Sequence, residues 1–227
     1  MTIDTVVFDV LGTLVDHDGG LRAAVAALVP GADGERLEAG VADWHRHVAT
    51  EHRRVVAGER AYVTADVLDR EAALRVAPDA DVADLERAAS VTARLDAWPD
   101  TAELLERLAA RYAVVALSNA DHATLLRLDA HAGLRWHAAL STETVRSYKP
   151  DPAVYRAAIA HVARPPEHVL MVAAHSWDLR AARAAGLRTA YLDRPGGDAP
   201  APDDAFDHHF ADVAALLATY GRQPAAS

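Results

Sequence analysis

Polar side chains that could do chemistry follow four apolar segments of this 227-residue chain, each near the point where the segment ends. They are Asp9, Ser118 with Asn119, Lys149, and His175 with Asp178. If the apolar segments are parallel strands, their carboxyl ends meet at one edge of a sheet, where open α/β sheets bind ligands. A single residue of this kind could be a helix cap, but four converging groups favour a shared site.

Asp9 follows the apolar run Val6-Val7-Phe8 and precedes the pair Gly12-Thr13. This pattern predicts a buried strand that ends in a tight turn. The carboxylate is then either a cap that accepts backbone N–H groups of the turn or a nucleophile that faces a ligand crevice. The polar groups further along the chain favour the nucleophile.

The composition excludes several classes of function. Hydrophobic residues make up 51% of the chain and charged residues 25%, as in ordinary globular proteins. The absence of cysteine excludes disulfides, thiolate metal sites and cysteine nucleophiles. A formal charge of −10 disfavours nucleic acid and anionic membranes as partners. The twelve histidines show no metal-ligand spacing, so we expect neither a metal nor a cofactor.

The sequence shows no sign of membrane insertion or export. No apolar run approaches the roughly 18 residues that a membrane span needs. The first residues, Met1-Thr2-Ile3-Asp4, lack the basic segment and the apolar stretch of a signal peptide. We therefore expect a cytoplasmic protein.

Hydrophobic periodicity divides the chain into two parts. Residues 21–97 show apolar residues at helical spacing in 21–28, 33–57, 64–76 and 82–95, without strand-like alternation. From Asp100 onward, predicted helices alternate with predicted strands at 113–117, 138–140, 169–172 and 189–192. Such alternation is typical of an α/β fold with a parallel sheet covered on both faces. We expect a core formed by residues 1–20 and 98–227 and a helical domain formed by residues 21–97, with His208-His209 as a solvated pair.

The stretch from Asp9 to Thr13 resembles the first motif of the haloacid dehalogenase (HAD) superfamily. This resemblance implies a Rossmann-like parallel-sheet core with a helical cap domain inserted after the first strand, and an Asp9 that the substrate esterifies. The superfamily's phosphatases carry a second aspartate at the position of Leu11, where it protonates the leaving alcohol. A halide leaves without a proton, so Leu11 favours carbon–halogen cleavage over phosphoester cleavage.

Two further segments look like the second and third motifs of the superfamily. Ser118 and Asn119 would hold the substrate's anionic group, although a helix cap is an alternative interpretation. Lys149, in Tyr148-Lys149-Pro150, would place its ammonium beside Asp9 and keep that carboxylate ionised. Tyr155 falls at the family's tyrosine position and is expected to contact substrate.

The fourth motif is identified in the segment that contains His175, Trp177 and Asp178. Asp178 would pair with Lys149, and Trp177 would form one wall of an apolar pocket for the halide. Asp178 is the only acid in this motif, which makes a poor ligand set for magnesium. His175 replaces the asparagine of L-2-haloacid dehalogenases, either as a neutral donor or as a general base for the water that cleaves the ester. Asp16 or Asp18 could orient its ring.

The carboxylate-binding arginine of the family directly follows a tryptophan-like position. Here Trp44 is followed by His45, and Arg46 comes next. Either Arg46 or His45 binds the substrate carboxylate, or neither does and the substrate is not a simple 2-haloacid. Arg53, Arg54 and Arg60 are further candidates.

The resemblance, which is strongest to the type II L-2-haloacid dehalogenases, implies a specific reaction. The expected activity is hydrolytic dehalogenation of short 2-haloalkanoic acids to 2-hydroxy acids through an ester on Asp9. The substrate is then a small-molecule haloacid, bound between cap and core, and the family often forms a homodimer. A magnesium-dependent phosphatase of the same superfamily and a catalytically silent binding protein are the alternatives.

Overall fold

The computed structural model describes residues 2–221 and is built on one parallel sheet of six strands, in the order β3-β2-β1-β4-β5-β6. The strands are β1 (Thr5–Asp9), β2 (Ala113–Ser118), β3 (Ala138–Ser141), β4 (Val169–Ala173), β5 (Arg188–Leu192) and β6 (His208–Phe210). The predicted α/β class and parallel sheet are confirmed. Because β1 pairs with both β2 and β4, Asp9 lies at the carboxyl end of a central strand.

The sixth strand was not predicted, and the expected solvated pair His208-His209 lies within it. These residues pair with Ala190 and Tyr191 of β5, and His208 Nε2 lies 2.8 Å from the hydroxyl of Tyr220. Only Phe210 of this edge strand is buried. Three residues with one apolar side chain are too few to show a period of two in the sequence.

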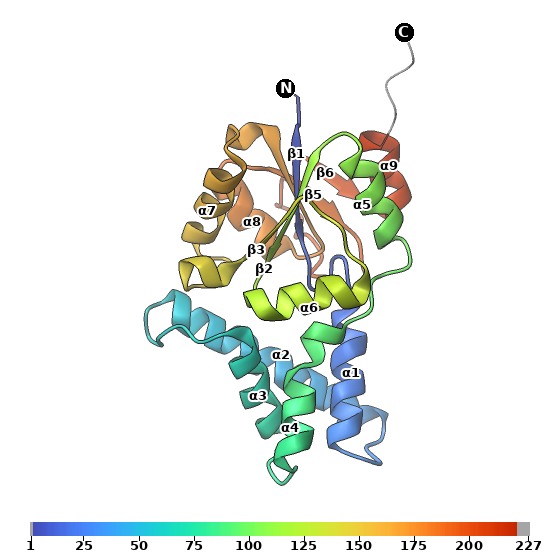
Figure 1. Cartoon of the computed structure of the whole chain (residues 1–227), viewed down its shortest axis with the longest axis vertical. Helices are drawn as coiled ribbons and strands as arrows, with labels where there is room; N and C mark the ends of the chain where they lie inside the picture. The colour runs from blue at the N-terminus through green and yellow to red at the C-terminus, as the bar shows by residue number, and fades with distance from the viewer. Residues whose placement is uncertain (1, 222–227) are drawn as a thin grey trace.

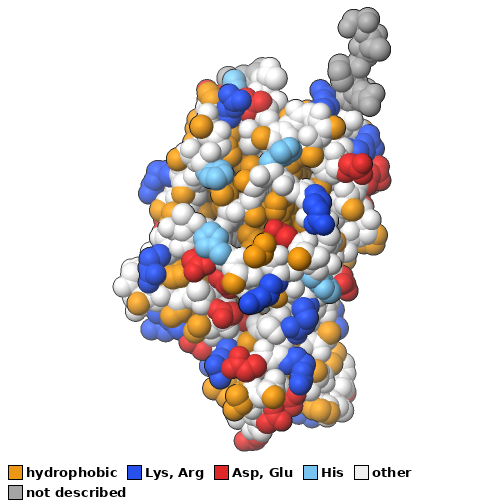
Figure 2. Space-filling model, in the orientation of Figure 1, with side chains coloured by type: hydrophobic (Ala, Val, Ile, Leu, Met, Phe, Trp, Pro, Cys, Tyr) orange, Lys and Arg blue, Asp and Glu red, His pale blue; other side chains and the backbone are white. Residues whose placement is uncertain are grey.

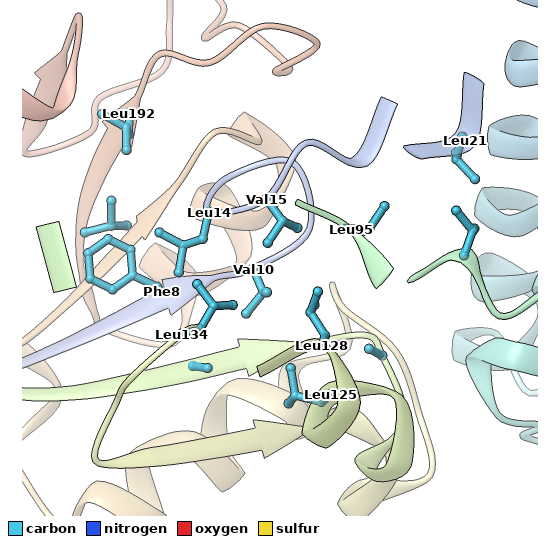
Figure 3. Packing of buried hydrophobic residues seen from close by; sticks show 14 of the residues in the cluster. Phe8, Val10, Leu14, Val15, Leu21, Leu95, Leu125, Leu128, Leu134 and Leu192 are labelled. Carbon is cyan, nitrogen blue, oxygen red and sulfur yellow. The ribbon is translucent and has the colours of Figure 1, made fainter. Parts of the chain in front are cut away.

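Alternation along β1 divides the core of the sheet into two faces. Figure 3 shows part of one of them, where Phe8 packs near Leu14, Leu134 and Leu192. Val6 and Phe8 pack with helices α5 (Thr101–Ala109), α6 (His122–Ala132) and α9 (Val213–Tyr220). Val7 packs on the other face with α7 (Pro152–Val162) and α8 (Ser176–Ala184). Both faces of β1 are therefore covered, which explains why its sequence is apolar without polar alternation.

A group of helices lies beyond one end of the sheet and consists of α1 (His17–Leu28), α2 (Gly34–Val56), α3 (Ala65–Val76) and α4 (Val82–Ala89) (Figure 1). Helix α1 begins four residues before the predicted start, because the carboxylate of Asp16 caps it by accepting the N–H of Gly19 at 2.8 Å. The predicted helix 82–95 is interrupted at Ser90 and continues as the 3-10 helix η1 (Val91–Arg94). Further 3-10 turns are η2 (Thr142–Val145) and η3 (Pro166–His168).

Two adjacent segments connect the helical group to the sheet. Asp16 N donates to the carbonyl of Asp96 at 2.9 Å where the chain enters and leaves the group. Asp100 directly precedes α5, but its side chain does not cap the helix and accepts two hydrogen bonds from Arg194 instead, at 2.7 and 2.8 Å. Arg194 also donates to the carbonyl of Thr13 at 3.0 Å, so the same guanidinium holds both the connection and the turn that follows Asp9.

The helical group is held together by polar as well as apolar contacts. Arg60 lies 2.6 Å from Glu51 and 2.5 Å from Glu71. The buried carboxylate of Asp69 accepts the indole N–H of Trp44 at 2.9 Å and the hydroxyl of Thr92 at 3.1 Å, which joins α2, α3 and η1. Basic and acidic side chains are interspersed over the part of the surface that these helices form (Figure 2).

The helices were also compared with the requirements for crossing a bilayer. Within residues 2–221, none of them combines the necessary length with sufficient apolar character.

Replacing Asp69 with asparagine should stabilise the protein at alkaline pH. Burial raises the pKa of Asp69 from 3.8 to about 6, so the folded state binds the proton more tightly and stability falls as the pH rises from about 4 to about 6. An amide does not ionise, and Asp69→Asn should therefore gain about 1–3 kcal/mol at pH 8 and little at pH 4. Urea unfolding at both pH values measures this difference, with the exposed Asp79→Asn as the control. A loss of stability at pH 8 would contradict the assignment.

Candidate active site

Asp9 and Thr13 form the centre of the site. Strand β1 ends at Asp9, and Gly12, with φ +79, turns the chain back so that the hydroxyl of Thr13 donates to Asp9 Oδ2 at 2.7 Å. The same hydroxyl accepts the N–H of Ala174, at the end of β4, at 2.9 Å. The left-handed conformation at position 12 favours glycine, and the turn thereby fixes one oxygen of the Asp9 carboxylate.

Lys149 bridges Asp9 to a second buried carboxylate. Its Nζ lies 2.5 Å from Asp9 Oδ1 and 2.6 Å from Asp178 Oδ2, and it donates to the carbonyl of Leu117 at 3.2 Å. Tyr155 donates to the other oxygen of Asp178 at 2.6 Å. Each of the three ammonium hydrogens therefore has an acceptor, and the predicted contact between Lys149 and Asp9 is present.

The charges of this cluster are coupled. Burial by itself would raise the pKa of Asp9, but Lys149, His175 and Thr13 outweigh it, and the pKa lies below its ordinary value. Burial and the nearby charge of Asp9 raise the pKa of Asp178, against the effect of Lys149. Although burial disfavours its charge, the two carboxylates raise the pKa of Lys149. Asp9 is therefore ionised at neutral pH.

Ser118 and Asn119 differ in their access to the site. Asn119 Oδ1 accepts the backbone N–H of Lys149 at 2.9 Å, and the residue lines the cavity beside Asp9. Ser118 is fully buried outside the cavity lining, and its hydroxyl oxygen accepts the N–H of Ala120 at 3.1 Å. The hydroxyl of Ser118 thus bonds within the turn after β2 and caps no helix, because the N-cap of α6 is Asp121, which accepts the N–H of Thr124 at 2.8 Å. Asn119 supports the segment that carries Lys149.

A cavity of about 490 Å³ opens between the carboxyl edge of the sheet and the helical group. The sheet side of its lining comprises Asp9, Leu11, Asn119, Lys149, Pro150, His175 and Trp177. The helical side comprises His17, His45, Val48, Ala49, His52, Arg53, Ala65, Asp69 and Thr92. The lining contains both apolar and polar side chains, as is common in small-molecule sites.

His175 lies close to Asp9, as the sequence predicted. Its Nε2 is 3.1 Å from the carbonyl oxygen of Leu11 and 3.9 Å from Asp9 Oδ2, and its ring stacks on Trp177 with centroids 5.8 Å apart. A carbonyl only accepts hydrogen bonds, so Nε2 carries the hydrogen in this arrangement. The imidazole is a donor here, and the role of base would require this bond to open.

Neither aspartate suggested to orient His175 does so. Asp18 Oδ1 lies 2.8 Å from His45 Nε2, and the carboxylate of Asp16 caps helix α1. Both residues belong to the start of the helical group, and this directs their side chains to local partners.

Two residues expected to bind substrate lie outside the cavity lining. Arg46 is exposed, with a guanidinium nitrogen 3.6 Å from Asp43. Successive residues of an α-helix differ by about 100° in direction, so Arg46 points away when its neighbour His45 faces the cavity. Tyr155 contacts Asp178 from behind the lining.

The other candidate arginines differ in whether they reach the cavity. Arg54 lies 2.9 Å from Glu51, which also binds Arg60. Arg53 lines the cavity and donates to Thr50 at 3.0 Å. Among the arginines proposed from the sequence, Arg53 is therefore placed to meet a ligand.

His17, His52 and Asp69 also line the cavity, although no motif in the sequence indicated them as site residues. His45 and His52 are seven residues apart on α2, a spacing that shares a helix face and could have indicated the second histidine. His17 gave no such signal. Burial and the neighbouring His45 lower its pKa to about 3, so its imidazole is neutral.

Within the described residues, no group of three or more histidine, aspartate or glutamate side chains is arranged to hold a metal ion. Beside Asp9 the positive charge comes from the Lys149 ammonium instead.

Comparison with known proteins agrees with this geometry. Residues 3–186 match the family model described as haloacid dehalogenase-like hydrolase. The chain belongs to this family. It is 35% identical to (S)-2-haloacid dehalogenase H-109 of Pseudomonas putida over 101 residues, 43% of this chain and 45% of that protein. The chain thus aligns with about half the length of the curated relatives it matches.

Two solved structures resemble this member of the family over nearly their whole length. The L-2-haloacid dehalogenase PA0810 has a TM-score of 0.82 and 34% identity, covering 94% of this chain and 97% of its own. The defluorinating L-2-haloacid dehalogenase Rha0230 has a TM-score of 0.85 and 31% identity, covering 96% and 95%. The expected family and fold are confirmed.

Replacing Lys149 with methionine should raise the pKa of Asp9 and destabilise the fold. Removing one member of a buried ion pair leaves uncompensated charge, which typically costs about 3–5 kcal/mol. Carbon-13 NMR titration of the aspartate carboxyls reports the pKa, and denaturant unfolding reports the stability. Tyr155→Phe is the control, because it leaves Lys149 between its two carboxylates. An unchanged Asp9 titration in Lys149→Met would contradict the coupling.

Proposed function

We propose that this protein hydrolyses short 2-haloalkanoic acids of the (S) series to 2-hydroxy acids through an ester on Asp9. The observation that carries the proposal is the local environment of the Asp9 carboxylate. Its carboxylate is ionised, held by Lys149 and Thr13, and lines a cavity that includes the apolar side chains of Leu11 and Trp177. The names of the relatives in the family support the same substrate class.

The first step forms the ester. An oxygen of Asp9 attacks the carbon that bears the halogen, the new C–O bond forms, and the C–X bond breaks with its electron pair leaving on the halide. No proton is required by the leaving group, which suits the apolar side chain of Leu11. Trp177 lines the same cavity and would form an apolar wall beside the departing anion.

The second step cleaves the ester. Water attacks the side-chain carbonyl carbon of Asp9, the bond to the former carboxylate oxygen breaks, and the 2-hydroxy acid leaves after taking up a proton. Lys149 and Thr13 are placed to stabilise the charge that develops on the Asp9 oxygens. The regenerated carboxylate then contains one oxygen from water.

Arg53 is the best counter-ion for the substrate carboxylate. The charge of Lys149, the other cation of the lining, is shared by Asp9 and Asp178. Arg53 lies on the helical side of the cavity, so the anion would be held opposite the sheet edge. In this proposal residues 21–97 act as a cap domain, and closing the cap over the core formed by residues 1–20 and 98–227 excludes water from the first step.

The geometry favours dehalogenation over the magnesium-dependent phosphatase. Leu11 has no carboxyl to protonate a leaving alcohol, and the ammonium of Lys149 lies 2.5 Å from Asp9, on the oxygen that a cation would need. These residues do not fit a magnesium site. A silent binding protein would have no need of an ionised, buried Asp9 at the cavity wall.

A homodimer also belongs to this proposal. Val67 and Leu74 of α3 are exposed, 38% and 49%, and seven residues apart on one helix face. Light scattering of the purified protein tests for this dimer.

Halide release should occur in the presence of a chelator, with oxygen exchange at Asp9. In heavy-oxygen water, repeated turnover of 2-chloropropionate should place the label in the Asp9 side chain, as read by peptide mass spectrometry. Asp9→Asn is the matched control and should release no halide. Label found in the product from the first turnover, with none in Asp9, would exclude the ester.

Accumulation of the ester on Asp9 would show which role His175 has. If His175 is the base, His175→Asn should form the ester but hydrolyse it slowly, so that the mass of the acid remains on Asp9. If its Nε2 only donates to the Leu11 carbonyl, the asparagine variant should turn over at about the wild-type rate. Intact-protein mass spectrometry during turnover separates the two roles.

A further inference from the structure

Helix α8 receives no capping hydrogen bond from the side chain of its own N-cap residue, which is His175. An N-cap side chain normally accepts the backbone N–H of the second or third helical residue. The imidazole of His175 instead contacts the carbonyl oxygen of Leu11, 3.1 Å from its Nε2. The side chain at the cap position therefore faces the site, and the helix needs an acceptor from elsewhere.

Asp198, in the loop between β5 and β6, supplies that acceptor. Its Oδ2 accepts the hydroxyl of Ser176 and the backbone N–H of Trp177, the latter at 3.3 Å. Trp177 is the second residue of α8, so this carboxylate takes the place of an N-cap side chain. A negative charge at this end of a helix also suits the helix dipole.

The backbone of Asp198 brackets His175. Its N–H donates to the carbonyl of Ala174 at 2.9 Å, and its carbonyl accepts the N–H of Ser176 at 3.0 Å. The loop approaches closely here, because a Cβ on Gly197 would lie 2.8 Å from the carbonyl oxygen of Ala174. The residues immediately before and after His175 are thus both bonded to Asp198.

The ring of His175 has little room to shift. A Cβ on Gly12 would lie 2.9 Å from its Nε2, so the imidazole packs directly on the turn that follows Asp9. Its Nε2 lies 3.9 Å from Asp9 Oδ2, and the ring stacks on Trp177. Movement at the start of α8 would therefore displace both rings relative to Asp9.

We propose that Asp198 is a positioning residue for the reaction: its carboxylate caps α8 and leaves the imidazole of His175 free to face Asp9. Asp198 lies outside the cavity lining and acts through Ser176 and Trp177. This assignment rests on the proposed function, in which the ester forms on Asp9. Since Asp198 is exposed, substitutions at this position should leave the fold intact.

Three substitutions of Asp198 separate its hydrogen bonds from its charge. Both side-chain donors bind the same oxygen, so Asp198→Asn keeps an acceptor without the charge. Asp198→Glu keeps the charge but moves the carboxylate by one methylene, and Asp198→Ala removes both. Asp203→Ala is the control, because this exposed acid of the same loop also acts on the charge of Arg180 in α8.

Nitrogen-15 NMR of histidine-labelled protein at pH 8 reports the state of the His175 ring. In the wild type Nε2 carries the hydrogen donated to the Leu11 carbonyl, so the two ring nitrogens should give well-separated signals. Asp198→Ala and Asp198→Glu should bring these signals closer together, because a ring released from the carbonyl exchanges between its two tautomers. Asp198→Asn and Asp203→Ala should match the wild type. The signals are assigned by their absence in His175→Asn.

Turnover of 2-chloropropionate tests whether this positioning serves the reaction. Asp198→Ala and Asp198→Glu should lower kcat about ten-fold and change KM about two-fold or less, because misplaced groups impair the reaction more than substrate binding. Asp198→Asn and Asp203→Ala should keep the wild-type kcat. Unchanged His175 signals or an unchanged kcat in Asp198→Ala would overturn the proposal.

The comparison of Asp198→Asn with Asp198→Glu covers the case in which Asp198→Ala does not fold. Losses in the asparagine variant that equal or exceed those in the glutamate variant would overturn the proposal, since charge would then matter more than hydrogen-bond geometry. If the wild type releases no halide, the proposed function fails, while the His175 signals still decide whether Asp198 positions the ring.

Discussion

One buried ammonium lies between two buried carboxylates at the carboxyl edge of the sheet, and the rest of the site depends on this interaction. Lys149, Asp9 and Asp178 are each at most 4% exposed. Charges removed from water in this way are stable only when each is paired and hydrogen-bonded. Thr13, Tyr155 and the carbonyl of Leu117 complete these bonds. The same pairing keeps Asp9 ionised, as its proposed role of nucleophile requires.

The parallel sheet brings the three charged residues together. Asp9 ends β1, Asp178 lies in the first turn of α8 after β4, and Lys149 follows β3. Since β1 lies between β2 and β4, its carboxyl end is flanked on both sides, and groups distant in sequence meet there. The turn at Gly12 and the hydroxyl of Thr13 then link Asp9 to the end of β4. A shift of any one strand would separate the charges.

The helical group provides the other half of the cavity. Helix α2 directs His45, His52 and Arg53 toward the site, while Asp69 on α3 joins the helices to one another. The apolar side chains of Leu11 and Trp177 line the cavity with Asp9, whereas the guanidinium of Arg53 lies on the α2 side. In the proposed function, the halogen of a 2-haloacid would lie at the sheet edge and its carboxylate at α2.

The sequence by itself determined the fold class and the centre of the site. Asp9, Lys149 and Asp178 each stand in a short motif beside a strongly apolar strand, and local pattern is enough to place such residues at one sheet edge. The motifs also identified Trp177 and His175 as cavity residues. Helix periodicity placed α2 and α3 to within a residue or two at each end.

Only the tertiary structure decided which side of α2 faces the cavity. Arg46 and His52 both belong to a long helix with charged and histidine residues on several sides. Its rotation is set by the packing of Val41 and Trp44 against the neighbouring helices, which the sequence of α2 alone does not specify. That rotation turns Arg46 to solvent and His52 inward. Strand β6 was likewise decided by its pairing with β5, because three residues carry too little periodicity to specify a strand. Long-range packing, which no local pattern encodes, selected the residues that complete the site.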